Sequence, residues 1–379
     1  MIRKKGKRMG EGLGKYFVLD LTEGEDGALC TEYLALAGMD IIRVEKPTVE
    51  REGETRARYI IKNLNKRYIT LDTASVEGQR ILQALALKAD VIVENSGQDK
   101  LKNSRVDYKS VRTGNPGVVY ISILPYASDS PWAGLPSDRS VISAMSGATY
   151  QCGQYGCEPV EPGGNLPDVT SCVFAATSAA AALYNRENTG EGKYIEINQM
   201  DSVIALDRSA YEKYLNNKIN DRTGNLLLSC SPTGLYKTTD GEVAIMCLAD
   251  PDFKPLCEAI GKPELADDPR FSNPKARVKN RAAIDAILSE WTAGLTKFEV
   301  MQRLLAERRV ICSAVYTIED LINSEDLRKM GLIKRVEDEK LGEMWIPTYT
   351  GVSDDFNLPA KLPSEVNADA LSKEGRYGL

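Results

Sequence analysis

The stretch YFVLDLTEGEDGALCTEYLALAGMDIIRV, residues 16–44, predicts a strand, a helix and a second strand in that order. The runs 16–20 and 39–44 have the composition of buried strands, whereas residues 27–38 place apolar side chains on one face of a helix. Further strand-like runs follow at residues 68–71, 90–93, 118–121 and 194–197, with helical patterns between them. Such alternation is typical of βαβ units, so we predict an α/β protein with a parallel sheet.

The second half of the chain predicts a change of architecture. Residues 168–186 and 200–214 favour helices, and residues 233–247 favour a hairpin that turns at Asp240-Gly241. Further helices are expected near residues 253–260, 282–293 and 297–307, and a strand near Trp345. We therefore predict a leader at 1–15, a large domain that begins with residues 16–223, a small α+β domain at 224–324, and a return to the large domain at 325–379.

Composition excludes several classes of function. With 48 Lys and Arg against 54 Asp and Glu, the net charge is −6, which argues against a nucleic-acid partner or an anionic membrane surface. No apolar run approaches the roughly 18 residues of a membrane span, and the basic start of the chain leads into no apolar stretch. We expect a cytoplasmic protein with reduced thiols.

The chain contains no histidine. This absence excludes a Ser-His-Asp triad, a Cys-His pair, an imidazole base and histidine metal ligands. The eight cysteines are scattered, and only Cys152 and Cys157 lie near each other, so we predict no metal site. Any catalysis must use carboxylates, cysteine, lysine, tyrosine or backbone dipoles.

One carboxylate stands at an expected helix start, in the sequence Gly163-Gly164-Asn165-Leu166-Pro167-Asp168. Asp168 could be a helix N-cap that accepts hydrogen bonds from first-turn amides. The same place also suits a nucleophile, because the helix dipole keeps a carboxylate ionised and nearby amides can stabilise an oxyanion. Such a nucleophile needs no general base. The residues alone leave both interpretations open.

An ordered set of short motifs resembles the class III CoA-transferases, the family of formyl-CoA, carnitine-CoA and bile-acid-CoA transferases. The motifs are Val18-Leu19-Asp20-Leu21-Thr22, Ile41-Ile42-Arg43-Val44-Glu45-Lys46-Pro47, Asn65-Lys66-Arg67-Tyr68-Ile69-Thr70-Leu71-Asp72, Ala89-Asp90-Val91-Ile92-Val93-Glu94-Asn95, Ala144-Met145-Ser146-Gly147 and Thr189-Gly190-Glu191-Gly192-Lys193 followed by Asp201. The resemblance covers residues from about 16 to 375.

The resemblance implies a Rossmann-like large domain built from both chain ends, a small middle domain and two chains interlocked as a homodimer. It also implies that Asp168 is the catalytic nucleophile. The reaction would move CoA from an acyl-CoA to a carboxylic acid through an aspartyl-CoA thioester, with no permanently bound cofactor, ATP or metal. The identities of the two acids are not implied.

CoA contacts carried over by position fall on Lys46, Leu71, Asn95, Ser96 and Gly97. A lysine at Lys46 could pair with a CoA phosphate or could simply be solvated, and Asn95 could bind ligand or form an Asx turn. The arginine expected after this last segment is replaced by Asn103. Lys102 and Arg105 are close by, and we predict that Arg105 is the CoA contact of this segment.

Three departures from the family pattern concern the acyl group. The loop that carries a glutamine in formyl-CoA transferase contains Glu23, Glu25 and Asp26, whose charges would repel an anionic acyl group or face solvent. Before the Ser-Gly pair stand Asp138 and Arg139, and Arg139 could hold an acceptor carboxylate or pair with Asp138. The chain also ends without the family's final helical tail.

Two other functions remain as alternatives. An acyl-CoA racemase or epimerase of the same superfamily uses a histidine base at the position of Asp138, which this chain cannot supply. A catalytically inactive CoA-binding paralogue would bind acyl-CoA without forming a covalent intermediate at Asp168.

Overall fold

The computed structural model describes residues 13–23, 27–47, 53–216, 222–348 and 359–379. The chain divides into two compact units. The first contains residues 1–149, 161–216 and 324–379, and the second contains residues 150–160 and 217–323. Residues 1–12 of the predicted leader, and Glu25 and Asp26 of the acidic loop, lie outside the described residues.

A seven-stranded parallel sheet forms the centre of the first unit. Its strands are β1 (Phe17–Asp20), β2 (Asp40–Glu45), β3 (Arg67–Thr70), β4 (Val91–Glu94), β5 (Val119–Leu124), β6 (Lys193–Asn198) and β12 (Ser364–Glu365). They lie in the order β12-β3-β2-β1-β4-β5-β6, and every pairing is parallel. The predicted α/β class and parallel sheet are confirmed. The central strands are apolar runs because both faces of the sheet are covered.

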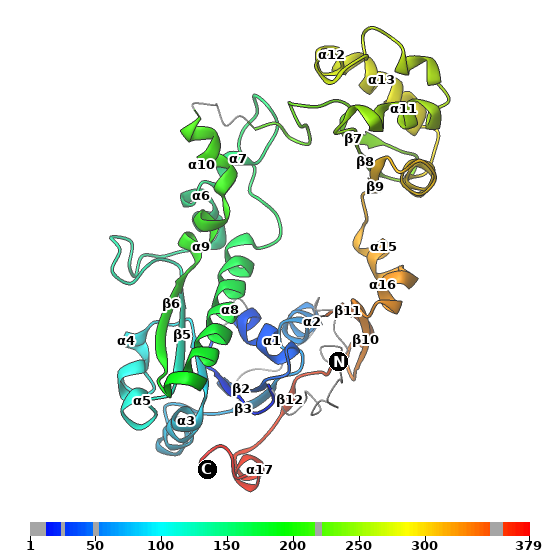
Figure 1. The fold of residues 1–379 in the computed structure, drawn as a ribbon. Helices are drawn as coiled ribbons and strands as arrows, with labels where there is room; N and C mark the ends of the chain where they lie inside the picture. Colours follow the sequence, from blue (N-terminus) through cyan, green and yellow to red (C-terminus); the bar gives the residue numbers. More distant parts are fainter. Residues whose placement is uncertain (1–12, 24–26, 48–52, 217–221, 349–358) are drawn as a thin grey trace, which may run out of the picture. The chain divides into compact units, whose positions relative to one another are not determined.

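Helices cover both faces of this sheet (Figure 1). One face packs against α1 (Ala28–Leu36) and α8 (Leu166–Thr189), and the other against α3 (Val76–Lys88) and α5 (Tyr108–Gly114). Buried Ala175 and Ala179 occupy the face of α8 toward this core, and their small side chains permit close packing. Among the described residues, α8 is also the one helix long and apolar enough for a membrane span, but half of its most apolar stretch is buried.

The remaining elements of the first unit surround the sheet. They are α2 (Gly53–Lys62), α4 (Gln98–Leu101), α6 (Arg139–Met145), α9 (Gln199–Leu206), α10 (Arg208–Leu215), α16 (Glu325–Lys329), β10 (Ile333–Asp338), β11 (Gly342–Pro347) and α17 (Ala368–Lys373), with α7 (Ala148–Gln151) at a boundary of the units. The prediction of one continuous helix at residues 200–214 is wrong in one respect. The segment is divided into two helices at Asp207, whose φ and ψ of −85° and 57° are not helical.

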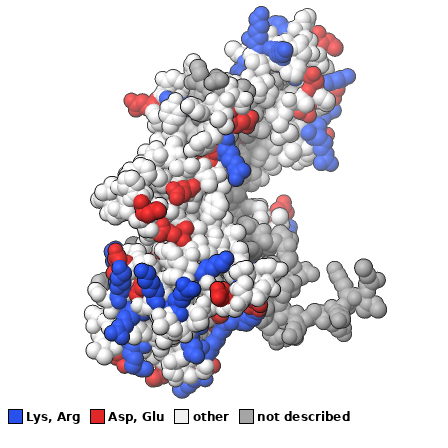
Figure 2. All heavy atoms as spheres, turned by 60° about the vertical axis from the view of Figure 1, so that its left-hand side comes forward, with Lys and Arg blue, Asp and Glu red and all other residues white. Residues whose placement is uncertain are grey.

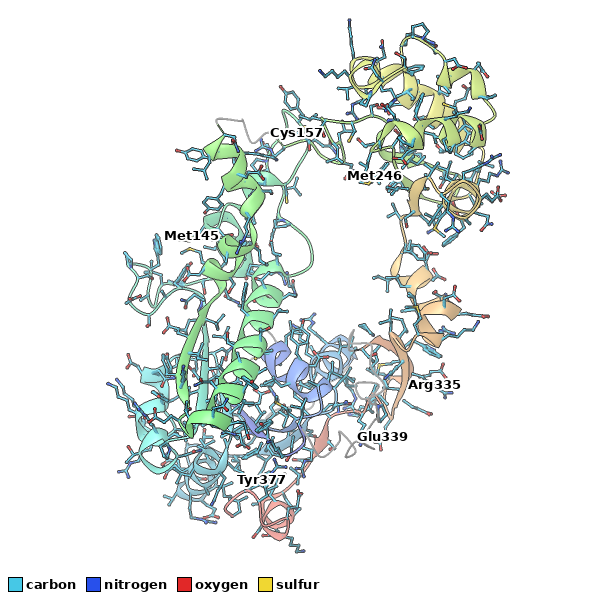
Figure 3. All side chains as sticks on the ribbon, viewed as in Figure 1. Met145, Cys157, Met246, Arg335, Glu339 and Tyr377 are labelled. Carbon is cyan, nitrogen blue, oxygen red and sulfur yellow. The ribbon has the colours of Figure 1, made fainter. Side chains whose placement is uncertain are left out.

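The C-terminal residues fold back onto the sheet of the first unit. Tyr377, labelled in Figure 3, is 1% exposed, and its ring meets Phe17 of β1 edge-on with 4.9 Å between ring centroids. Its hydroxyl is hydrogen-bonded to Asp40 of β2. Arg376 donates from Nη1 to the carbonyl oxygen of Gly14 at 2.9 Å. The end of the chain is therefore part of the core around the first strand.

The second unit is an antiparallel sheet with helices. The strands are β7 (Thr233–Lys237), β8 (Glu242–Met246) and β9 (Ile311–Ala314), and the first two form the predicted hairpin. The helices are α11 (Asp250–Ala259), α12 (Pro274–Lys279), α13 (Arg281–Thr292), α14 (Lys297–Met301) and α15 (Ile318–Asn323), with a 3₁₀ helix at Pro263–Ala266 and a π-helical stretch at Gln302–Ala306. The helix expected at 297–307 is thus partly a π-helix.

Candidate active site

The strand order reverses between β1 and β4, because β1 pairs with β2 on one side and with β4 on the other. Ligands of open parallel sheets bind at the carboxyl ends of the strands at such a reversal. Two segments leave the sheet there. Residues 21–27 lead from β1 to α1, and residues 95–97 follow β4.

Beneath the first of these segments lies a buried charge cluster of Asp20, Arg43 and Lys66. Asp20 is fully buried and accepts hydrogen bonds from Arg43 Nη1 at 3.1 Å and from Lys66 Nζ at 3.2 Å. Burial alone would raise the pKa of Asp20, but these two cations lower it well below its ordinary value. Asp20 Oδ1 also accepts from the backbone N–H of Thr22 at 3.0 Å. The ionised cluster therefore fixes the start of the 21–27 segment.

The two segments at the strand ends are joined by Asn95. Its Oδ1 accepts from the Glu23 N–H at 2.7 Å, and its Nδ2 donates to the Glu23 carbonyl oxygen at 3.0 Å. Position 27 requires glycine because its neighbours leave no room for a side chain. A Cβ there would lie 2.6 Å from Thr22 Cβ and 2.9 Å from Asn95 Nδ2. Asn95 therefore forms a structural contact with Glu23. Its role in binding CoA stays a prediction.

A pocket of about 480 Å³, the first pocket, opens on one side of these segments. It is lined by Leu21, Thr22, Glu23, Arg43, Val44, Glu45, Lys46, Thr73, Leu82, Ser96, Lys100, Leu101, Ser104 and Val106. Lys46 Nζ lies 2.6 Å from Glu23 Oε1, and the Lys46 side chain is 65% exposed. Lysine and arginine side chains gather on the face where α3, α4 and α5 lie (Figure 2), including exposed Lys100, Lys102 and Arg105. The first pocket therefore adjoins a basic surface.

The backbone amides of Ser96 and Gly97 are already hydrogen-bonded. Buried Glu94 accepts from the N–H groups of Ser96 and Gly97, both at 2.8 Å. Gly97 has a φ of 87°, which favours glycine. A ligand contact by Ser96 would therefore use its side chain or carbonyl oxygen.

Two other predicted CoA contacts, Leu71 and Arg105, are not among the lining residues of the first pocket. The Leu71 side chain is 6% exposed and packs in the core beneath α3. Arg105 is exposed, with a φ of 55°, between the lining residues Ser104 and Val106. Their roles in binding CoA stay predictions.

A second pocket of about 240 Å³ lies on the other side of Asn95. It is lined by Gly27, Asn95, Ile123, Pro125, Ser137, Asp138, Arg139, Asp168, Ser171 and Gln199. The structure thus brings together Asp168, Asp138 and Arg139, which the sequence had separated by up to 30 residues of chain. Ser96 lines the first pocket and Asn95 the second, so adjacent residues border the two spaces.

Asp168 lies in the first turn of α8 and is 4% exposed. The interpretation of Asp168 as the N-cap is wrong: the N-cap is Asn165, whose φ and ψ of 51° and 46° are left-handed. Leu166 and Pro167 open the helix, and Asp168, which follows them, lines the second pocket. Gln199 Nε2 donates to Asp168 Oδ1 at 2.6 Å. A carboxylate in the first turn is favoured by the helix dipole.

Asp138 and Arg139 form the start of α6. Asp138 is its N-cap and accepts from the Ser140 N–H at 2.9 Å, a bond that lowers the pKa of Asp138. Arg139 Nη1 donates to Asn165 Oδ1 at 2.9 Å. Within the described part of the chain, Arg139 forms no ion pair with Asp138. The structure therefore does not show the alternative in which Arg139 pairs with Asp138.

Gln199, Ser137 and Ser171 were missed in the sequence. Gln199 directly follows β6, whose apolar run at 194–197 was recognised as a strand. The carboxyl ends of all parallel strands meet at one edge, so the residue after this strand was a candidate on the same grounds as Asn95. Within the described ranges, no three His, Cys, Asp or Glu side chains gather as metal ligands.

Residues 13–363 match the model of CoA-transferase family III. The chain is 30% identical to succinyl-CoA–D-citramalate CoA-transferase of Chloroflexus aurantiacus over 86% of this chain and 84% of that protein. It is 29% identical to formyl-CoA:oxalate CoA-transferase of Streptomyces avermitilis, covering 86% and 85%. A CAIB/BAIF family protein from Brucella suis has a similar solved structure, with a TM-score of 0.84, 26% identity, and coverage of 96% and 99%. The chain belongs to CoA-transferase family III and is a CoA-transferase.

Proposed function

We propose that this enzyme transfers CoA from an acyl-CoA to a carboxylic acid through a covalent thioester on Asp168. The observation that carries the proposal is the placement of Asp168, a buried carboxylate in the first turn of α8 that lines the second pocket. The first pocket, with Lys46 and the neighbouring basic surface, supplies cations suited to the CoA phosphates. Its Ser96 adjoins Asn95 of the second pocket, so a thioester can span both.

In the first half-reaction, an Asp168 oxygen attacks the acyl carbonyl carbon of the donor. The carbon–sulfur bond breaks, which gives a mixed anhydride and CoA thiolate. The thiolate then attacks Asp168 Cγ, and the donor acid leaves as a carboxylate that carries the bridging oxygen. The acceptor carboxylate attacks the resulting thioester and the two steps run in reverse. Each bond broken is replaced by one of similar energy, so no net oxidation or proton transfer is required.

The lining of the second pocket favours a substrate with a small polar acyl group. Its lining is dominated by polar side chains, and Arg139 can bind a second carboxylate of the substrate through its guanidinium. Curated relatives include enzymes named for succinyl-CoA, D-citramalate and oxalate. We propose a dicarboxylic or hydroxylated short acid, held by Arg139 near Asp138.

The proposed assembly is an interlocked homodimer in the cytoplasm. Helix α10 has no buried residues, and its exposed Tyr214 and Leu215 are 78% and 77% accessible. An apolar surface of this kind supports contact with a second copy. The compact units support the predicted large domain from both chain ends and small domain at 224–324. All eight cysteines are free thiols, in keeping with a reducing compartment. Light scattering tests the dimer, because a monomeric mass would contradict it.

The test of the chemistry is intact-protein mass after incubation with a panel of acyl-CoAs. The wild type is expected to gain the mass of CoA minus water and to lose it with hydroxylamine, whereas Asp168→Ala gains nothing. Asp369→Ala is the matched control, since Asp369 is an exposed carboxylate in the first turn of α17. CoA binding without any adduct would favour the inactive paralogue, and α-carbon deuterium wash-in from D₂O would reveal a racemase.

A further inference from the structure

Gln199 is held in a fixed position beside the proposed nucleophile. It is the first residue of α9, immediately after β6. The next residue, Met200, is 8% exposed and donates its N–H to the Pro125 carbonyl oxygen at 3.2 Å. Val203, 2% exposed, anchors the following turn. The backbone that carries Gln199 is therefore fixed by strand pairing on one side and by buried side chains on the other.

The contact between the two side chains is short and chemically specific. Gln199 Nε2 lies 2.6 Å from Asp168 Oδ1, and Asp168 is 4% exposed. A carboxamide donates a hydrogen bond without carrying charge, so it orients the carboxylate but does not neutralise it as a lysine or arginine would. This hydrogen bond therefore orients the Asp168 carboxylate without adding a positive charge to it.

We propose that Gln199 is a catalytic residue that stabilises negative charge on Asp168 Oδ1 when Cγ of the aspartyl group is attacked. The inference rests on the proposed function, since it concerns the anhydride and thioester formed on Asp168. It assigns distinct roles to the two carboxylate oxygens. Oδ2 forms the bond to the acyl carbon, and Oδ1 remains on the aspartate as the carbonyl oxygen.

The charge on Oδ1 appears at a defined step. When the CoA thiolate attacks Cγ, a sulfur lone pair forms the S–Cγ bond and the C=O π pair moves onto Oδ1. The pair then returns, the Cγ–Oδ2 bond breaks, and the donor acid leaves as a carboxylate. Nε2 of Gln199 is already at hydrogen-bond distance from Oδ1, as a preorganised oxyanion donor must be. The reverse charge movement occurs when the acceptor acid attacks.

The first test removes the donor and keeps the size of the side chain. Gln199→Met is expected to lower kcat about 100-fold to 1,000-fold, the usual effect of losing one oxyanion donor, with little change in KM for acyl-CoA. Gln302→Met is the matched control, because Gln302 is exposed in the second unit. A kcat for Gln199→Met within about threefold of wild type would overturn the proposal.

The second test uses the isosteric variant Gln199→Glu and a pH profile. The introduced carboxyl lies against the Asp168 carboxylate, and two such groups share one proton at low pH. The shared proton restores a donor, so activity relative to wild type is expected to be highest near pH 5–6. It should then fall up to tenfold per pH unit as the pair loses its proton. A purely structural role for Gln199 predicts parallel profiles for the variant and the wild type, and that result would also overturn the proposal.

Failure of this inference is distinguishable from failure of the proposed function. If wild-type protein forms the hydroxylamine-sensitive adduct on Asp168 but Gln199→Met forms it at the wild-type rate, only the role of Gln199 is wrong. If wild-type protein forms no adduct with any acyl-CoA, the aspartyl mechanism itself is wrong. Circular dichroism of both Gln199 variants confirms that they fold.

Discussion

Residues 21–23, which follow β1, lie next to charged groups of two different kinds. Next to β1, the buried charge cluster of Asp20, Arg43 and Lys66 excludes water, with Asp20 and Lys66 side chains at 0% exposure. At the pocket, Glu23 and Lys46 form an ion pair with side chains 52% and 65% exposed. Buried charges are costly to separate, whereas exposed pairs contribute little to stability. The comparison indicates that the buried cluster fixes the fold and that the exposed pair remains available to a ligand.

The largest effect is expected from Asp20→Asn. The substitution retains much of the shape but leaves Arg43 and Lys66 buried without their shared counter-charge. The free energy of unfolding should fall by about 3–5 kcal/mol. Urea unfolding followed by circular dichroism measures the change, with Glu23→Gln as the exposed control. Equal midpoints for the two variants would show that the buried and exposed groups do not differ as argued.

The buried carboxyls of Glu32 and Asp20 are expected to change the stability of the fold with pH in opposite directions. Burial raises the pKa of Glu32 to about 7, despite the nearby charge of Lys66, so its carboxyl is neutral in the folded state at low pH. Stability is therefore lost as pH rises from about 4.5 to about 7. The opposite holds for Asp20, whose lowered pKa gives stability above about pH 4 that is lost as pH falls. Glu32→Gln should be more stable than wild type by about 1–3 kcal/mol at pH 8 and equal at pH 4. Parallel pH curves in urea unfolding would contradict this.

Gly27→Ala tests the packing between the two segments. The added Cβ would overlap Thr22 and Asn95 at less than 3.0 Å, so the backbone must shift. We expect a loss of about 1–2 kcal/mol in unfolding free energy, together with a clear loss of activity, because Gly27 and Asn95 both line the second pocket. Gly294→Ala is the control, since a Cβ there meets nothing within 4 Å. Wild-type activity in Gly27→Ala would show that the close packing of Gly27 against Thr22 and Asn95 is not needed for catalysis.

The smallest effect on stability is expected from Lys46→Met. Its exposed pair should contribute less than about 0.5 kcal/mol to unfolding. In contrast, KM for acyl-CoA should rise about tenfold at low salt and less at 0.5 M salt, where phosphate attraction is screened. Lys373→Met on α17 provides an exposed control. An unchanged KM at low salt would exclude Lys46 from CoA binding.

Sequence patterns predicted the elements whose environment is simple. The strands of the sheet are buried on both faces, so runs such as 91–93 are apolar and easily recognised. Ser75 is the N-cap of α3, and serine is a residue type typical of helix starts. The break at Asp207 was missed because exposed Tyr211 and Tyr214 imitate a buried helical face. Gln199 was missed because its partner, Asp168, is 31 residues away along the chain.

Tyr377 has a consequence for the synthesis of the protein. Its ring packs against Phe17 of β1, and Arg376 is hydrogen-bonded to Gly14, so contacts between residues up to 362 positions apart along the chain complete the packing around the first strand. Contacts with such long sequence separation form late and slowly. The nascent first unit must therefore keep β1 incompletely covered until residues 376 and 377 have been translated, and a variant without these two residues would leave that part of the core open.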